Sequence, residues 1–131
     1  MERRHVTMRS LLPILLLQIS STWSRDLTVI TVATKKTDGY SRFLRSCENA
    51  GLDLTTLGMG QEWQGGDMNY PGGGWKVNLL KREMEKRKDD HENLVMFTDS
   101  YDVVIAAGKE AIIAQYEDFS ASIVFGAENF C

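Results

Sequence analysis

The sequence has little of several features that would assign a protein to a class at once. It has only two cysteines in 131 residues, which excludes a disulfide-rich scaffold and gives no zinc-ligand spacing. Basic residues are not in excess, since 15 Lys and Arg face 18 Asp and Glu, and we therefore expect no nucleic-acid partner bound by phosphate neutralisation. The remaining composition, 43% apolar and 25% charged residues, is that of one ordinary folded domain.

Long apolar runs are also missing, and this excludes a typical membrane anchor. Residues 11–19 are nearly all apolar, but they are roughly half of the ~20 residues that a helix needs to cross a bilayer. Three arginines precede this run and small polar residues follow it, which is typical of a secretory signal peptide. We predict a signal peptide over residues 1–24, no transmembrane anchor, and a location in the endoplasmic reticulum lumen or outside the cell.

Apolar patterning in the remaining residues, 25–131, predicts strands that alternate with helices. Runs that are β-branched or continuously apolar predict strands at residues 27–33, 52–57, 93–98 and 122–127. Apolar residues at helical spacing predict helices at residues 38–50, 75–88 and 109–119. This alternation predicts an α/β fold, with a mostly parallel sheet, helices on both sides and right-handed crossovers.

Single residues refine the prediction for the helices. Asp38 is expected to cap the first helix and Gly51 to end it. Cys47 falls on the apolar side of that helix and is expected to be a small core residue, although an oxidising compartment would allow Cys47 and Cys131 to form disulfides. The charged run KREMEKRK in the second helix is interpreted as a solvated face.

Residues that follow the predicted strands are the candidates for function, because ligands of open parallel sheets bind beyond the carboxyl ends of the strands. Thr34 follows the first strand, and a glycine-rich loop at residues 58–74 follows the second. Loops of this length in a compact domain are usually functional or mobile. Within the loop, Trp63 offers a stacking face for a base, but packing of Trp63 into the core is equally open.

Two carboxylates, Asp99 and Asp102, follow the third predicted strand. At this spacing they can converge on one hard cation such as Mn²⁺ or Mg²⁺, which would neutralise a diphosphate leaving group. The spacing fits equally well a structural role in which Asp99 caps a turn and Asp102 is simply exposed. A general acid–base pair is the third alternative, but nothing nearby suggests that one carboxyl stays protonated.

The glycine run at residues 72–74 leads into the second predicted helix, with Lys76 in its first turn. Backbone N–H groups at such a helix start can approach phosphate, and Lys76 would add a positive charge. The loop matches neither a Walker A motif nor a Rossmann fingerprint, so a plain surface loop is the alternative. The sequence shows no G-x-S-x-G or similar nucleophile setting, and the catalytic residue is left unassigned.

Taken together, five blocks of the sequence resemble a known family. They read VITVATKKTDGYSRFLRS, LGMGQEWQGGD, GGGWKV, VMFTDSYDVVIAAG and FGAENFC. In this order they resemble the amino-terminal glycosyltransferase domain of procollagen lysyl hydroxylases, most closely the multifunctional hydroxylase and glycosyltransferase type. The resemblance covers essentially all of residues 27–131.

The resemblance implies the first half of a GT-A-like (Rossmann-like) domain that binds Mn²⁺ and a UDP-sugar donor, UDP-glucose or UDP-galactose. The acceptor in the full-length family is hydroxylysine or galactosylhydroxylysine of collagen. By matching position, Asp99 and Asp102 are implied to be metal ligands, with Tyr101 beside the uridine. The same matching implies nucleotide contacts for a further group of residues: Thr34, Trp63, Met68 and Lys76. Two residues depart from the family pattern, since Trp75 replaces a Gln and Met68 a Val.

We expect residues 25–131 to be a partial glycosyltransferase domain without the acceptor half and without the Fe(II)/2-oxoglutarate hydroxylase domain. The expected function is therefore UDP-sugar binding within a collagen hydroxylysine glycosyltransferase. The alternative is a catalytically silent fragment that acts as a nucleotide-binding or dimerising module, with a homodimer in the full-length form. Whether the chain itself is an enzyme, and which sugar it handles, are left open by the sequence.

Overall fold

Strands and helices alternate along the chain in the computed structural model, which describes residues 25–65 and 74–126. The described elements are β1 (Leu27–Val32), α1 (Asp38–Asn49), β2 (Asp53–Leu57), α2 (Gly74–Lys86), β3 (Leu94–Phe97) and α3 (Lys109–Asp118). Each begins and ends within about two residues of the range predicted from the sequence. The predicted α/β alternation is therefore confirmed as far as α3.

The three strands form one parallel sheet in the order β2-β1-β3. Val29 of β1 lies opposite Leu54 of β2 on one side and Met96 of β3 on the other. The central strand β1 is buried on both faces, because Val29 and Ile30, which point to opposite faces, both have no exposed surface. This burial explains why the β1 sequence is nearly continuous in apolar and β-branched residues.

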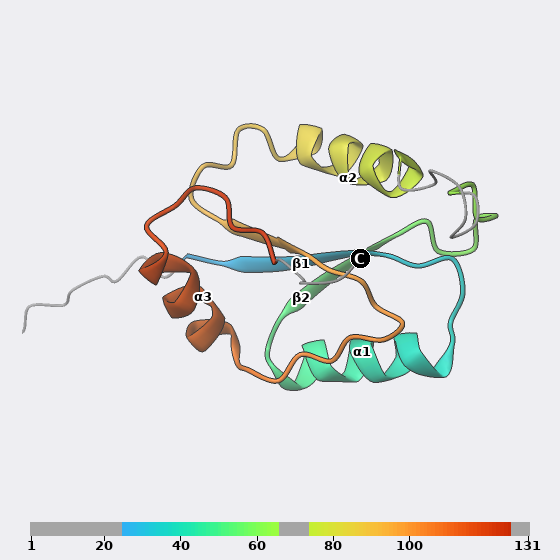
Figure 1. Cartoon of the computed structure of the whole chain (residues 1–131), viewed down its shortest axis with the longest axis horizontal. Helices are drawn as coiled ribbons and strands as arrows, with labels where there is room; N and C mark the ends of the chain where they lie inside the picture. Colours follow the sequence, from blue (N-terminus) through green and yellow to red (C-terminus); the bar gives the residue numbers. More distant parts are fainter. Residues whose placement is uncertain (1–24, 66–73, 127–131) are drawn as a thin grey trace, which may run out of the picture.

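Helices cover both faces of the sheet. Figure 1 shows α2 on one face and α1 with α3 on the other. The core cluster lies on the α1 side and comprises Leu27, Val29, Phe43, Cys47 and Leu52. Cys47 is fully buried and its thiol is free, and burial raises the pKa of Cys47. The prediction that Cys47 is a core residue is confirmed.

The start of α1 differs from the prediction in one residue. Thr37, not Asp38, is the N-cap, because the Thr37 hydroxyl accepts a hydrogen bond from the Tyr40 N–H at 3.1 Å. Asp38 is the first helical residue, where its charge still suits the positive end of the helix dipole. Gly51 follows the helix with φ +68, a left-handed conformation that favours glycine and ends α1 as predicted.

The fourth predicted strand is not formed over its described residues, 122–126, so this prediction was wrong there. Ser120 turns the chain after α3 with φ 49, and the Tyr116 hydroxyl donates a hydrogen bond to the Ser122 carbonyl at 2.9 Å. Ile123 and Phe125 are 71% and 86% exposed. A strand needs a ladder partner, and here the segment is held by α3 instead of by β3.

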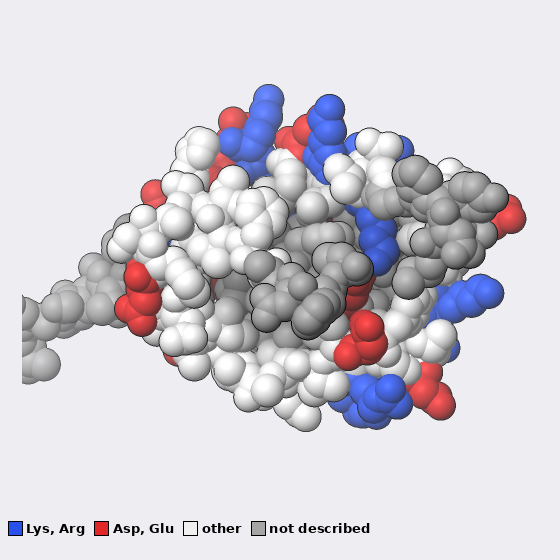
Figure 2. Space-filling view, in the orientation of Figure 1, with Lys and Arg blue, Asp and Glu red and all other residues white. Residues whose placement is uncertain are grey.

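The charged surface of α2 faces solvent, as the KREMEKRK run predicted. Figure 2 shows Lys and Arg side chains along the edge of the molecule that α2 forms. One residue departs from this pattern, since Glu83 is only 8% exposed and pairs with Lys86 at 2.6 Å and Arg87 at 3.4 Å. The hydrogen bond from Lys86 is the main reason why the pKa of Glu83 is lowered.

Among the described residues, the helices are all too short or too polar to cross a bilayer. The predicted signal peptide over residues 1–24 lies outside the part of the chain that the structure describes. It remains a prediction from the sequence.

Candidate functional site

The strand order creates one position where the chain reverses direction across the sheet. The connection through α1 leads from β1 to β2, whereas the connection through α2 crosses back past β1 to β3. The switch point therefore lies between the carboxyl ends of β1 and β3, which is where open α/β sheets bind their ligands. Thr34 follows β1 at this point, and residues 99–102 follow β3.

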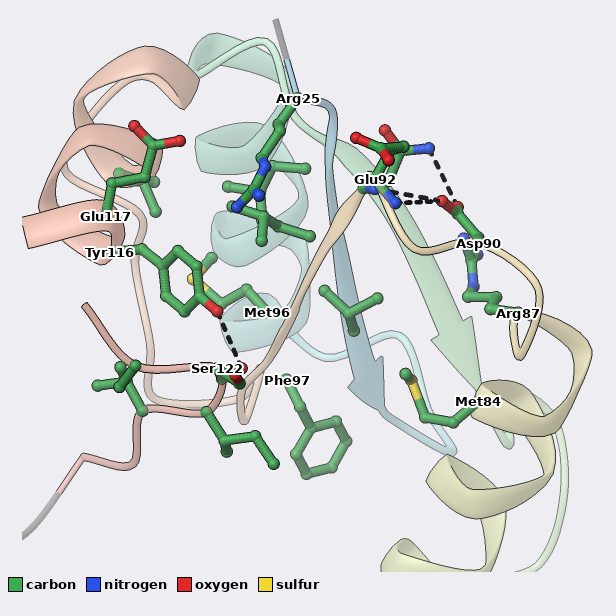
Figure 3. A pocket seen from close by; sticks show the side chains of 18 of the residues that line it. Arg25, Met84, Arg87, Asp90, Glu92, Met96, Phe97, Tyr116, Glu117 and Ser122 are labelled. Atoms are coloured by element: carbon green, nitrogen blue, oxygen red, sulfur yellow. Dashed lines mark hydrogen bonds between the residues drawn. The ribbon is translucent and has the colours of Figure 1, made fainter. Parts of the chain in front are cut away.

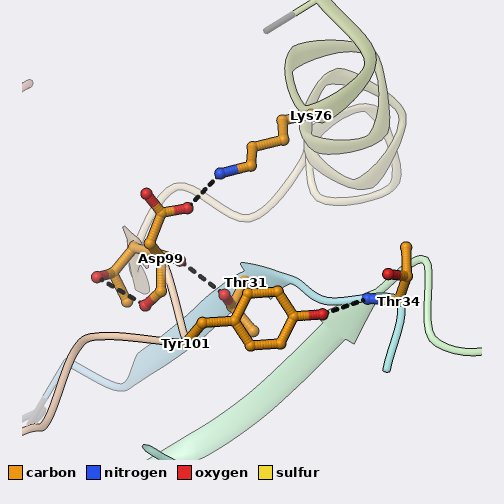
Figure 4. Close-up of polar contacts among 6 residues, drawn as sticks. Thr31, Thr34, Lys76, Asp99 and Tyr101 are labelled. Carbon is orange, nitrogen blue, oxygen red and sulfur yellow. Dashed lines mark hydrogen bonds and ion pairs between the residues drawn. The ribbon is translucent and has the colours of Figure 1, made fainter. Parts of the chain in front are cut away.

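Tyr101 joins the two sides of the switch point. Its hydroxyl oxygen accepts a hydrogen bond from the N–H of Thr34 at 3.0 Å (Figure 4). It also accepts one from the N–H of Lys35 at 3.2 Å. Partial burial would raise the pKa of Tyr101, but these backbone donors favour the ionised oxygen and lower its pKa overall. The contact fixes the segment after β1 against the segment after β3.

Lys76 joins the start of α2 to the same place. Its ammonium nitrogen lies 2.5 Å from Oδ1 of Asp99 (Figure 4). The side chains of Lys76 and Asp99 are 32% and 59% exposed, so the pair is open to solvent and contributes little to stability. The Asp99 carboxylate thus pairs with a positive group just beyond the carboxyl end of β3.

Trp63 belongs to the same group of residues and does not lie in the core. Its side chain is 44% exposed, and the Lys76 ammonium lies 6.0 Å from its ring centroid. Trp75 packs its ring against Trp63 in a T-shaped arrangement, with ring centroids 5.1 Å apart. Trp75, which replaces the Gln of the family pattern, therefore braces the aromatic face beside Lys76.

Glycines in the loop after β2 make room for these two rings. A Cβ at Gly65 would lie 2.1 Å from a ring atom of Trp63, and a Cβ at Gly58 would lie 2.9 Å from a ring atom of Trp75. Gly58 also has φ +78, which strains any L side chain. These two glycines thus let the aromatic rings approach the backbone, whereas the phosphate contacts predicted from the sequence concern the glycine run at residues 72–74.

Two threonine hydroxyl groups support the backbone beside Asp99. The fully buried Thr31 donates a hydrogen bond to the Thr98 carbonyl at 2.7 Å, and Thr98 donates to the Asp99 carbonyl at 3.2 Å. Ser100 is 1% exposed, and its hydroxyl has no partner among the described residues. Sequence reasoning missed this support, although threonine in an otherwise apolar strand was a visible signal.

Gly39 also positions the 99–102 segment and was not singled out from the sequence. A Cβ at this position would lie 2.0 Å from the carbonyl oxygen of Tyr101, so only glycine allows α1 to approach the 99–102 segment this closely. The available signal was a glycine in the first turn of a helix, where glycine costs about 1 kcal/mol relative to alanine.

The structure brings most of the site residues proposed from the sequence into two contact groups. Lys76 contacts both Asp99 and Trp63, and Tyr101 contacts Thr34. The short segment from Asp99 to Tyr101 joins the two groups. Asp102 is exposed on the same segment as Asp99. Met68 and the glycines at 72–73 lie outside the described residues, so their predicted contacts stay predictions.

The chemistry of this donor set fits a hard divalent cation that brings further ligands with it. Asp99 already accepts one positive group, the Lys76 ammonium. In the described ranges 25–65 and 74–126, three or more His, Cys, Asp or Glu side chains do not converge as a metal cage. Sites with one or two carboxylates are typical of Mg²⁺-like ions that keep waters and bind substrate phosphates.

A separate groove of about 1170 Å³ runs along the open side of β3. Figure 3 shows Met96 and Phe97 from β3 in this groove, together with Tyr116 from α3 and the chain around Ser122. Phe97 is 40% exposed there. The groove has the apolar character of a sheet edge and contains none of the proposed metal or nucleotide residues, so we do not assign it to the candidate site.

Comparison with known proteins identifies the family. The model of the PLOD GT domain matches residues 23–131. The chain belongs to this family. It is 45% identical over 111 residues to procollagen-lysine,2-oxoglutarate 5-dioxygenase of Drosophila melanogaster and 47% identical over 106 residues to the human multifunctional procollagen lysine hydroxylase and glycosyltransferase LH3.

These matches cover most of the chain but a small part of each relative. They cover 85% and 80% of this chain, and 15% and 14% of the fly and human proteins. Human procollagen-lysine,2-oxoglutarate 5-dioxygenase 2 is 42% identical over 110 residues, with similar coverage. The resemblance noted in the sequence to the amino-terminal glycosyltransferase domain is therefore confirmed.

Proposed function

We propose that this chain is the UDP-sugar-binding part of a collagen hydroxylysine glycosyltransferase. The observation that carries the proposal is the cluster at the switch point of the sheet. There a half-exposed indole, a lysine and an acidic segment from three different elements lie in contact. An aromatic face, a cation and carboxylates are the groups that a nucleoside diphosphate with a divalent ion requires.

The nucleotide is proposed to lie against Trp63, with Tyr101 and Thr34 beside the uridine. Trp63 is 44% exposed, and the ring of Trp75 packs against it in a T-shaped arrangement. Lys76 lies in the first turn of α2, and we propose that it contacts the diphosphate there, at the positive end of the helix. Met68 would complete the nucleotide contacts from outside the described residues.

Asp99 and Asp102 are proposed to hold Mn²⁺. When bound, the ion neutralises charge that develops on the UDP leaving group. The chain's own residues orient the donor, since the Tyr101 hydroxyl fixes the loop after β1 and the Thr31–Thr98 hydrogen bond fixes the loop that carries Asp99. We assign no catalytic base.

The proposed acceptor is hydroxylysine of collagen in the full-length protein, in the secretory pathway. The support is twofold: the names of the relatives refer to procollagen lysine, and residues 1–24 have the pattern of a signal peptide. This chain spans about a seventh of those relatives, and transfer to collagen is proposed for the full-length protein.

The test is isothermal titration of the purified full chain with UDP, with and without Mn²⁺. We expect binding that needs Mn²⁺ and that weakens by about tenfold or more in Asp99→Asn and in Asp102→Asn. Asp89→Asn, at an exposed position beyond α2, is the matched control and keeps the affinity. Equal UDP affinity with and without Mn²⁺ contradicts the metal role, and no UDP binding contradicts the proposal as a whole.

A further inference from the structure

We propose that Lys76 exchanges partners during loading of the site, neutralising Asp99 before ligands arrive and moving to the diphosphate when a divalent cation takes its place. This inference rests on the proposed function, because it concerns the same metal and nucleotide. It adds that Lys76 opposes binding of the metal alone and favours binding of the metal with UDP.

The first step is the position of the Lys76 ammonium. It lies 2.5 Å from Oδ1 of Asp99, in a pair that joins α2 to the segment after β3. A divalent ion binds a carboxylate oxygen at about 2 Å, and an ion on the same oxygen would then lie within about 5 Å of the ammonium. Two positive charges at that separation repel each other. The position that Lys76 now occupies is therefore disfavoured while Asp99 holds the ion.

The second step is where Lys76 can go. Its side chain reaches solvent, with 32% of its surface exposed, and lysine has a long, flexible stem that allows the ammonium to change partners. The ammonium already lies 6.0 Å from the centroid of the Trp63 ring, the face proposed for the nucleotide. A diphosphate beside that ring offers the nearest new anion, at the amino-terminal end of α2, a helix of 13 residues.

The exchange predicts effects of opposite sign on two ligands. Removing the Lys76 charge frees Asp99, so Mn²⁺ alone binds more tightly. It also removes a contact to the diphosphate, so UDP binds more weakly in the presence of Mn²⁺. By linkage, the factor by which UDP tightens Mn²⁺ binding then becomes smaller. A lysine that serves only as a phosphate contact would leave binding of Mn²⁺ alone unchanged.

The experiment is titration of the full chain with Mn²⁺, following the electron paramagnetic resonance signal of the free ion, in the absence and presence of UDP. In Lys76→Met we expect Mn²⁺ alone to bind about two- to fivefold more tightly, since the pair is solvent-exposed. We expect UDP, with Mn²⁺ present, to bind about tenfold more weakly. Lys76→Gln should repeat both effects, and thermal unfolding checks that each variant is folded.

Lys81→Met is the matched control, because Lys81 is exposed on the same helix and its loss changes the net charge equally. It should leave both affinities unchanged. The double variant Asp99→Asn with Lys76→Met should lose the gain in binding of Mn²⁺ alone, since Asp99 is the proposed point of competition.

Two outcomes separate the proposals. If wild type binds Mn²⁺ with UDP but Lys76→Met binds Mn²⁺ alone no more tightly, the exchange is wrong and the proposed function stands. If wild type binds no Mn²⁺ even with UDP, the proposed function fails, and the exchange fails with it. An equal gain in Lys81→Met also overturns the exchange, because the effect would then be one of overall charge.

Discussion

The carbonyl oxygen of Tyr101 lies so close to the α-carbon of Gly39 that a side chain at position 39 would meet this oxygen at 2.0 Å. The first turn of α1 therefore sets the position of the segment that carries Asp99 and Asp102. Glycine weakens a helix, so its presence at the start of α1 is explained by this close approach. The metal ligands proposed here thus depend on a residue with no side chain.

Gly39→Ala should displace the 99–102 segment, because a Cβ and a carbonyl oxygen cannot share this space. We expect the free energy of unfolding to fall by about 1–3 kcal/mol, as in other overpacked sites. We also expect the Mn²⁺-dependent affinity for UDP to fall by about tenfold, since proposed ligands move. Urea denaturation and isothermal titration measure the two effects.

Gly74→Ala is the control for this substitution. Gly74 is also in the first turn of a helix, but a Cβ there would meet no atom of the described residues within 4 Å. Its free energy of unfolding should stay the same or rise slightly, because alanine favours helix more than glycine. A loss of stability in Gly74→Ala equal to that in Gly39→Ala would show that helix position, and not the Tyr101 contact, explains the effect.

Trp75→Gln restores the residue of the family pattern and tests the brace on Trp63. The T-shaped contact between the two rings should contribute about 0.5–1.5 kcal/mol. We expect that loss in free energy of unfolding, and a weaker affinity for UDP because the Trp63 face is less firmly held. Val77→Gln, at a 62% exposed position of the same helix, should change neither quantity. An unchanged affinity for UDP in Trp75→Gln would contradict the proposal that Trp75 holds the Trp63 ring in position.

Patterns with a clear period predicted the fold well. The buried run of β1 and the apolar stripe with Phe43 and Cys47 depend on burial, and burial is what periodicity reports. Residues 122–126 show the limit of this reasoning. Their β-branched composition fits a strand, but a ladder needs a neighbour, and Tyr116 holds the Ser122 carbonyl instead. Composition alone does not say which partner a segment has.

The sequence predicted which residues belong to the candidate site, but it did not predict which of them contact each other. Asp99, Tyr101 and Thr34 could be placed at one edge because parallel strands end together. The Lys76–Asp99 pair joins residues 23 positions apart. The close approach of the Tyr101 carbonyl to Gly39 joins residues 62 positions apart. Such contacts depend on where α1 and α2 lie over the sheet, which local sequence does not fix.

The change of N-cap gives a test that two single substitutions can decide. Thr37→Ala removes the hydroxyl that accepts the Tyr40 N–H, and we expect a loss of about 1 kcal/mol in the free energy of unfolding. Asp38→Ala removes only a charge near the helix start, worth about 0.3–1 kcal/mol at low salt. High salt should reduce the second effect and not the first. Chemical denaturation at two ionic strengths would reveal the opposite ranking if Asp38 were the cap.

The contact between Asp26 and Lys109 predicts a pH dependence of stability. Oδ1 of Asp26 accepts hydrogen bonds from the Lys109 ammonium at 3.1 Å and from the Leu27 N–H at 2.9 Å. The Lys109 hydrogen bond, then the Leu27 N–H, lower the pKa of Asp26 below its usual 3.8, and Asp26 raises the pKa of Lys109 above its usual 10.5. The pair joins the start of β1 to the start of α3.

Because the folded-state pKa of Asp26 is lowered, the unfolded chain binds more protons than the folded chain as pH falls below 3.8. The stabilisation from the pair is therefore complete above that value and is lost as pH falls through the folded pKa. At the other end the stabilisation is lost as pH rises through the raised pKa of Lys109.

Lys109→Met should thus reduce stability at neutral pH and have little effect in strong acid. Titration followed by the carboxyl ¹³C signal measures the pKa of Asp26, which should return toward 3.8 in Lys109→Met. It should stay low in the control Lys88→Met, because Lys88 is at an exposed site. An unchanged pKa in Lys109→Met would assign the shift to the Leu27 N–H alone.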